Sequence, residues 1–139
     1  MRHLALDFGE RRIGVAVGSP ETGLTFPRKA IDRKKMHEGN SLRVFCSEES
    51  ISKIVVGMPS RTDGKPGERE DRVRSWSDKI LKPLNIPYVF QDEAYSTQRA
   101  LDLTAHYSTK NKQDKGKLDS AAACVILNDY FENIKKQNP

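Results

Sequence analysis

The sequence has few of the residues that build disulfides or soft-metal sites. Its 139 residues include only two cysteines and three histidines. Cys46 and Cys124 lie in unrelated segments without a Cys-x-x-Cys spacing, so we expect two reduced core thiols and no zinc site. The histidines, at positions 3, 37 and 106, are too scattered in the sequence to suggest a metal or catalytic cluster.

Long apolar runs are also missing. No stretch approaches the ~20 apolar residues of a membrane span. Residues 1–20 have no long apolar run and carry Asp7, Glu10, Arg11 and Arg12, unlike a secretory signal peptide. We therefore expect a cytoplasmic protein that forms one domain over residues 1–139. Its 24 Lys and Arg against 19 Asp and Glu give a net charge of +5, which is compatible with a polyanionic partner but does not identify one.

The first apolar run contains an acid. Residues 4–8 predict a buried strand that includes Asp7, Gly9 permits a sharp turn, and residues 13–17 predict the returning strand of a hairpin. A carboxylate in such a strand is costly to desolvate unless it is paired, hydrogen-bonded or bound to a cation. Asp7 could also only cap a turn, so this position alone does not decide its role.

The rest of the chain predicts a mixed sheet with helices on its faces. Further strands are expected at residues 24–31, 54–56 and 88–90, the first confined to an edge by Pro27. Helices are expected at residues 41–50, at 68–84 with Trp76 in the core, from Ser96 onward, and at 118–134. The basic segment 107–117 is expected to be a loop. In such sheets, sites lie beyond the carboxyl ends of the central parallel strands.

Three acids from separate segments are candidates for one site: Asp7, Glu93 after a later strand, and Asp119 at the start of the last helix. Converging carboxylates repel one another unless a divalent cation neutralises them, and oxygen ligands favour Mg²⁺ or Mn²⁺. Two alternatives remain open at this point. Asp92 competes with Glu93 for the same role, and Asp119 could be only the N-cap of its helix.

Four motifs around these acids occur in order and cover nearly the whole chain. They are LALDFGERRIGVAV at 4–17, VVGMP at 55–59 followed by Asp63-Gly64, DExxST at 92–97, and KGKLDSAA at 115–122. Together they resemble the YqgF (RuvX) family of the ribonuclease H-like superfamily. The resemblance implies an α/β, ribonuclease H-like fold with a five-stranded mixed sheet flanked by helices.

The resemblance also implies a function. It implies a metal-dependent nuclease that processes the 5′ end of pre-16S rRNA in ribosome biogenesis, with Holliday junction resolution as the alternative. Asp7, Glu93 and Asp119 match the acids of the family. Ala94 stands where the family usually has arginine, so a phosphate contact of that arginine could be missing here. Ala122 stands where classical junction resolvases carry a fourth acid, which leaves the binding of a second metal open.

Several cations could hold phosphates on either side of the cleaved bond. They are Arg11, Arg12, Arg61, Lys65, Lys110, Lys112, Lys115 and Lys117. Such contacts position the backbone without reading sequence, although any one of them could be only a solvated charge. The expected partner is structured nucleic acid, either pre-rRNA or branched DNA, bound by a monomer or a homodimer. A non-catalytic RNA-binding assembly factor with vestigial acids is the rival interpretation.

Overall fold

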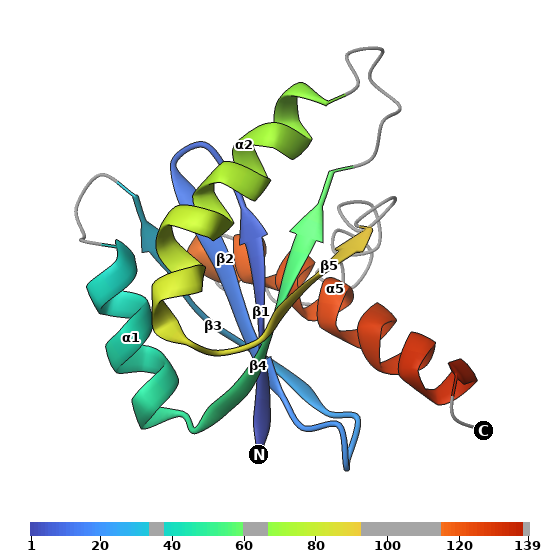
Figure 1. The fold of residues 1–139 in the computed structure, drawn as a ribbon. Coiled ribbons are helices and arrows are strands. Elements are labelled where there is room, and N and C mark those ends of the chain that lie inside the picture. The colour runs from blue at the N-terminus through green and yellow to red at the C-terminus, as the bar shows by residue number, and fades with distance from the viewer. Residues whose placement is uncertain (34–37, 60–66, 93–114, 138–139) are drawn as a thin grey trace.

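The computed structural model describes residues 1–33, 38–59, 67–92 and 115–137, without the side chains of Glu38, residues 115–119 and Gln137. Five strands form one mixed sheet (Figure 1). They are β1 (Arg2–Phe8), β2 (Arg12–Gly18), β3 (Thr25–Asp32), β4 (Ile51–Met58) and β5 (Tyr88–Asp92). The spatial order is β3-β2-β1-β4-β5. The first three strands pair antiparallel, whereas β1, β4 and β5 run parallel.

Helices cover both faces of the sheet. α1 (Glu38–Glu48) and α2 (Glu68–Trp76) lie on one face, and the long helix α5 (Lys115–Gln137) lies on the other (Figure 1). None of the helices described in the structure is long and apolar enough to cross a membrane. The expected strands are confirmed, including Pro27 on the edge strand β3. The helix expected at 41–50 is confirmed, although it begins three residues earlier.

The alternation of β1 divides its side chains between two cores. Leu4 and Leu6 belong to a cluster with Leu42 of α1 and Val73 of α2. Ala5 instead packs with residues of α5. Because successive side chains of a strand point to opposite faces, Asp7 lies on the α5 face and Phe8 lies on the α2 face.

The helix predicted over residues 68–84 changes its form before it ends. Regular α-helix stops at Trp76, and a π-helical turn (Ser77–Leu81) and a 3₁₀ turn (Lys82–Leu84) follow. Pro83 has no N–H for the carbonyl four residues earlier, so the α-helical ladder cannot run through this segment. Trp76 is buried in the core as predicted, with 6% of its surface exposed.

Helix α5 begins earlier than the sequence predicts. Lys115 and Lys117 lie in its first turn, so the prediction of a loop over 107–117 is wrong at its carboxyl end. Asp119 is therefore in the second turn of the helix, and the alternative that it is only an N-cap is wrong as well. The helix predicted from Ser96 lies outside the described residues. Both cysteines are buried and unpaired, as predicted.

Candidate active site

Asp7 lies at the carboxyl end of β1, directly opposite Gly14 of β2. Its side chain is half-buried. It lines an open cavity of about 240 Å³ whose other walls are the β1–β2 turn and its flanks: Gly9, Glu10, Arg11, Arg12 and Gly14. Two carboxylates, Asp7 and Glu10, and two arginines therefore share a solvent-accessible hollow at this edge of the sheet, where a phosphate and a cation could meet.

The β1–β2 turn is held in a fixed shape. The Gly9 N–H donates to the Arg12 carbonyl at 3.0 Å. A Cβ atom on Gly9 would lie 2.6 Å from that oxygen, so only glycine fits without a backbone shift. Arg33, which follows β3, donates from Nη1 to the Gly9 and Glu10 carbonyls at 3.1 and 3.3 Å. The Arg33 guanidinium also lies 4.2 Å from the ring centre of Phe8. Arg33 was not predicted as a site residue.

Ser120 attaches the start of α5 to this region. Its side chain is completely buried. Its Oγ accepts a hydrogen bond from the Val15 N–H at 3.1 Å and donates one to the Arg28 carbonyl. The register between β2 and β3 shifts at this point, next to Val15, so the hydroxyl serves backbone groups at an irregularity in the ladder. The second turn of α5 is thereby fixed to β2 one residue from Gly14.

The three predicted acids differ in how much of each residue the structure describes. Asp7 is described in full, and Asp119 is described as a backbone position beside Ser120 in α5. Glu93 lies outside the described residues, one position after the end of β5. Among the side chains that the structure describes, no three His, Cys, Asp or Glu residues are grouped as metal ligands.

Asp92 does not share the face of Asp7. The preceding residue, Gln91, faces α5, because its Oε1 accepts a hydrogen bond from Asn133 Nδ2 at 3.1 Å. Phe90 packs against the core on the α1 and α2 side. Alternation along β5 therefore places the exposed Asp92 on the α2 side, opposite to Asp7.

The predicted phosphate contacts are only partly described. Arg11 is exposed and Arg12 is half-buried, and both line the Asp7 cavity. Lys115 and Lys117 are placed as backbone positions at the start of α5. The remaining four, Arg61, Lys65, Lys110 and Lys112, lie outside the described residues.

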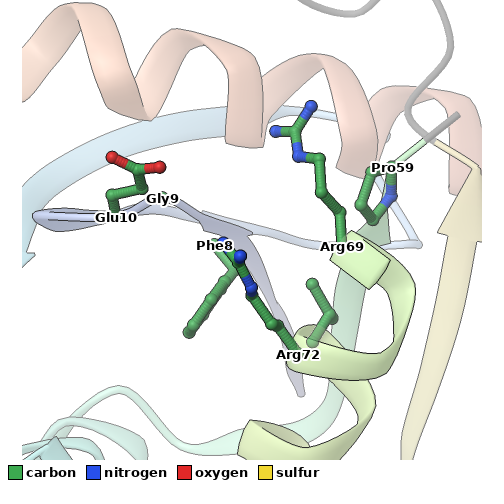
Figure 2. A pocket seen from close by; sticks show the side chains of 7 residues that line it. Phe8, Gly9, Glu10, Pro59, Arg69 and Arg72 are labelled. Atoms are coloured by element: carbon green, nitrogen blue, oxygen red, sulfur yellow. The ribbon is translucent and has the colours of Figure 1, made fainter. Parts of the chain in front are cut away.

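A second cavity, of about 220 Å³, lies between the β1–β2 turn and α2 (Figure 2). Its lining includes Arg69 and Arg72, which rise from α2 on the side of the cavity opposite Glu10. Neither arginine was predicted as a candidate site residue, because cations on the polar face of an amphipathic helix are ordinary. Only the placement of α2 beside the β1–β2 turn distinguishes these two arginines from other exposed cations.

His3 is half-buried near the amino end of β1, at the other end of the strand from Asp7. Its ring lies 6.1 and 5.7 Å from those of Tyr130 and Phe131, centre to centre. Burial lowers the pKa of His3, so the imidazole is neutral at physiological pH. This packing explains His3 without a catalytic role.

Comparison with known proteins identifies the family. The family model described as "RuvX: Holliday junction resolvase" matches residues 1–133. The chain belongs to the RuvX family. The resemblance drawn from the four motifs is thereby confirmed.

Curated relatives match the RuvX chain over nearly its full length. A protein of Thermus thermophilus is 37% identical over 132 residues, covering 94% of this chain and 97% of its own. A protein of Halothermothrix orenii is 33% identical over 138 residues, covering 98% of each chain. Both carry the name "Putative pre-16S rRNA nuclease".

Solved structures share the fold of this RuvX member. Thermus thermophilus RuvC, in complex with a Holliday junction substrate, aligns with a TM-score of 0.63 at 12% identity, covering 97% of this chain and 96% of RuvC. The fowlpox virus resolvase, with Holliday junction DNA, gives 0.61 at 12% identity, covering 96% and 99%. The predicted ribonuclease H-like fold is confirmed.

Proposed function

We propose that this RuvX protein is a metal-dependent nuclease that hydrolyses phosphodiester bonds of precursor 16S rRNA. The observation that carries the proposal is the position of Asp7. It is the penultimate residue of the central strand β1, on the face covered by α5, in an open cavity that it shares with Arg11 and Arg12. The names of the curated relatives favour rRNA as the substrate.

The donor chemistry at this edge fits a hard divalent cation. Asp7 offers carboxylate oxygens, and Gly14 opposite it adds no side chain that would fill the hollow. In the proposal, Asp7, Glu93 and Asp119 together hold Mg²⁺ or Mn²⁺. Such an ion, when bound, supplies an activated water and neutralises charge on the phosphate.

The placement of the neighbouring acids supports this ligand set. Asp92 lies on the other face of the sheet from Asp7, which favours Glu93 as the ligand from this segment. Ser120 fixes the backbone beside Asp119 to β2, one residue from the partner of Asp7. Asp119 would thus reach the site from a helix position that is held rigidly.

In the proposal, the three acids and the two arginines contribute in different ways. The carboxylates orient the ion, so none of them needs to act as a general base. Arg11 and Arg12 offer charge-assisted hydrogen bonds to the phosphate oxygens on either side of the cleaved bond. Such contacts place the backbone and are independent of base sequence.

Holliday junction resolution is the second candidate, favoured by the description of the family model. A paired incision would call for a two-fold dimer, in which two copies present their sites to a four-way junction. Ala122 weighs against close similarity to classical resolvases. It is buried in a cluster with Ala121 and Val125 and supplies no fourth carboxylate.

Cleavage of four end-labelled substrates tests the proposal. The substrates are a 5′-extended 16S precursor, single-stranded RNA, single-stranded DNA and a four-way DNA junction, each incubated with Mn²⁺ or Mg²⁺. We expect preferred cutting of the precursor near the mature 5′ end. Symmetric paired incision of the junction alone would instead select the resolvase function. Binding of RNA without cutting of any substrate would leave a non-catalytic assembly factor.

A further inference from the structure

The hollow at Asp7 continues along the molecule beyond the predicted active site. The Asp7 cavity and the cavity beside α2 share Gly9 and Glu10 as lining residues. The cavity beside α2 in turn shares Phe8, Glu10 and Arg72 with a third cavity, of about 500 Å³. The third cavity extends along α2 to Trp76 and, just beyond the helix, Lys79. We call the two cavities beside α2 the arginine groove.

Positive charge dominates this path. Among the residues that the structure describes, six cations line the three cavities: Arg11, Arg12, Arg33, Arg69, Arg72 and Lys79. Three described carboxylates, Asp7, Glu10 and Asp71, line them as well, so the described lining has an excess of three positive charges. A divalent ion at Asp7 would increase that excess. A chain of negative charges is the ligand that such a path complements.

Arg69 is the side chain in the groove best placed to take an external anion. It is exposed, and within the described part of the chain it forms no hydrogen bond or ion pair. Arg72, one helical turn later, pairs with Glu68 at 3.0 Å, but both side chains are more than half exposed. Water screens that pair, so a phosphate could compete for Arg72. Figure 2 shows both arginines on the same side of the cavity.

The groove offers charge but little surface for stacking bases. Phe8 is covered on one ring face by the Arg33 guanidinium, at 4.2 Å. The ring of Trp76 packs against Phe8 at a centre distance of 5.2 Å. Trp76 is itself almost completely buried. A strand lying here would therefore be held by its phosphates and not by its bases.

We propose that the arginine groove binds the sugar-phosphate backbone of the substrate strand next to the cleavage point, with Arg69 and Arg72 contacting successive phosphates. This inference rests on the proposed function for the identity of the substrate. It adds a binding path that leaves the active site on the α2 side of the β1–β2 turn. The shared chemistry is a phosphodiester chain, which either RNA or DNA could supply.

Binding measured without cleavage tests the groove. The probes are fluorescein-labelled single-stranded RNA from the 16S precursor, the same RNA with a scrambled sequence, the matching single-stranded DNA and a four-way DNA junction. Dissociation constants are measured over a range of KCl concentrations in EDTA, for Arg69→Gln and Arg72→Gln in an Asp7→Asn background. Arg43→Gln is the matched control, because Arg43 is an exposed helical arginine on α1 that lines none of the three cavities.

We expect each groove variant to bind every probe more weakly. The slope of the logarithm of the binding constant against the logarithm of the KCl concentration (the salt slope) should become less steep by roughly 0.7 on single strands, equally for native and scrambled RNA. Arg43→Gln should leave the slope unchanged. A larger effect on RNA than on DNA would identify RNA as the natural occupant, and an effect confined to the junction would identify branched DNA. Groove variants that bind every probe as Arg43→Gln does would overturn the inference, as would a loss confined to one RNA sequence.

The two proposals fail separately in this design. If the wild type cuts the precursor but the groove variants bind normally, the nuclease function stands and the groove inference is wrong. If the groove variants lose salt-dependent binding but the wild type cuts nothing, the groove stands and the nuclease function is wrong.

Discussion

Ser120 shows how one small side chain can fix the geometry of a site. Its hydroxyl satisfies a backbone donor on β2 and a backbone acceptor on β3 where the strand register shifts. A buried amide or carbonyl without a partner is costly, so this single group stabilises the sheet and the seating of α5 together. Asp119 precedes it directly, and any displacement of Ser120 would also move Asp119.

Ser120→Ala should therefore lower the free energy of unfolding by about 1–3 kcal/mol, because the Val15 N–H and the Arg28 carbonyl lose their shared partner. Urea denaturation followed by circular dichroism measures the change. Ser52→Ala is the control: the Ser52 hydroxyl also donates to a backbone carbonyl, that of Arg2, but at an exposed position. If both variants unfold at the same urea concentration, Ser120 does not have this role.

The same variant gives a second measurement. If Asp119 is a metal ligand, loosening α5 at Ser120 should weaken Mn²⁺ binding, detected as free Mn²⁺ by electron paramagnetic resonance. Unchanged Mn²⁺ affinity in a folded Ser120→Ala protein would show that Ser120 stabilises the fold without positioning Asp119.

At the scale of elements, the β1–β2 hairpin carries the described part of the candidate site. Its turn is closed by the hydrogen bond from the Gly9 N–H to the Arg12 carbonyl, and Arg33 contacts it from the end of β3. Asp7, Arg11 and Arg12 all belong to this hairpin or its turn, so their relative positions depend on the turn geometry.

Gly9→Ala should distort this turn, because the added methyl group would lie 2.6 Å from the Arg12 oxygen. We expect a loss of about 1–3 kcal/mol in the free energy of unfolding. Gly39→Ala is the matched control, since a Cβ at that helical position meets nothing within 4 Å. It should be neutral, or stabilise α1 by up to about 1 kcal/mol. Equal stability of the two variants would contradict the steric account of Gly9.

The order of elements could be predicted from the sequence because it depends on local patterns. Short apolar runs bounded by glycine and polar turns marked the strands, and Pro27 correctly predicted an edge. The π-helical and 3₁₀ turns after Trp76 were not predicted, because the apolar spacing at residues 80–84 also fits a regular helix. The start of α5 was missed because its first residues are polar, as in a loop.

The features of the candidate site could be predicted only in part, and for a physical reason. Asp7 was recognisable as a charge inside an apolar run. Ser120 directly precedes the apolar run 121–127 of α5, but its role depends on a register shift between two strands that are distant from it in sequence. Arg69 and Arg72 become candidates only through the packing of α2 beside the β1–β2 turn. Such tertiary relations have no periodicity in the sequence.

At the scale of the whole molecule, two cores on opposite faces of one sheet hold the edge that carries Asp7. Each core contains one cysteine: Cys46 belongs to the core on the α1 and α2 side, and Cys124 to the core on the α5 side. Burial raises the pKa of each thiol to about 11. A raised pKa keeps both thiols protonated, and therefore unreactive, well above neutral pH.

Native protein treated with iodoacetamide at about pH 8 should consequently show almost no alkylation, because the thiolate is the reactive form. Both cysteines should react once urea unfolds the chain, and mass spectrometry identifies each site. Cys46 and Cys124 should become reactive at the same urea concentration if the two cores unfold together. Rapid alkylation of either thiol in the native protein would contradict the burial described here.

The most direct test of the central claim compares cleavage of the 5′-extended 16S precursor by the wild type and Asp7→Asn, each with Mn²⁺ and with EDTA. Thermal unfolding of both proteins verifies that the variant is folded. Asp7→Asn keeps the size of the side chain but removes the charge that would hold the ion. The account predicts Mn²⁺-dependent cutting by the wild type, none in EDTA, and background cutting by the variant. Equal cutting by both proteins, or cutting that persists in EDTA, would contradict it.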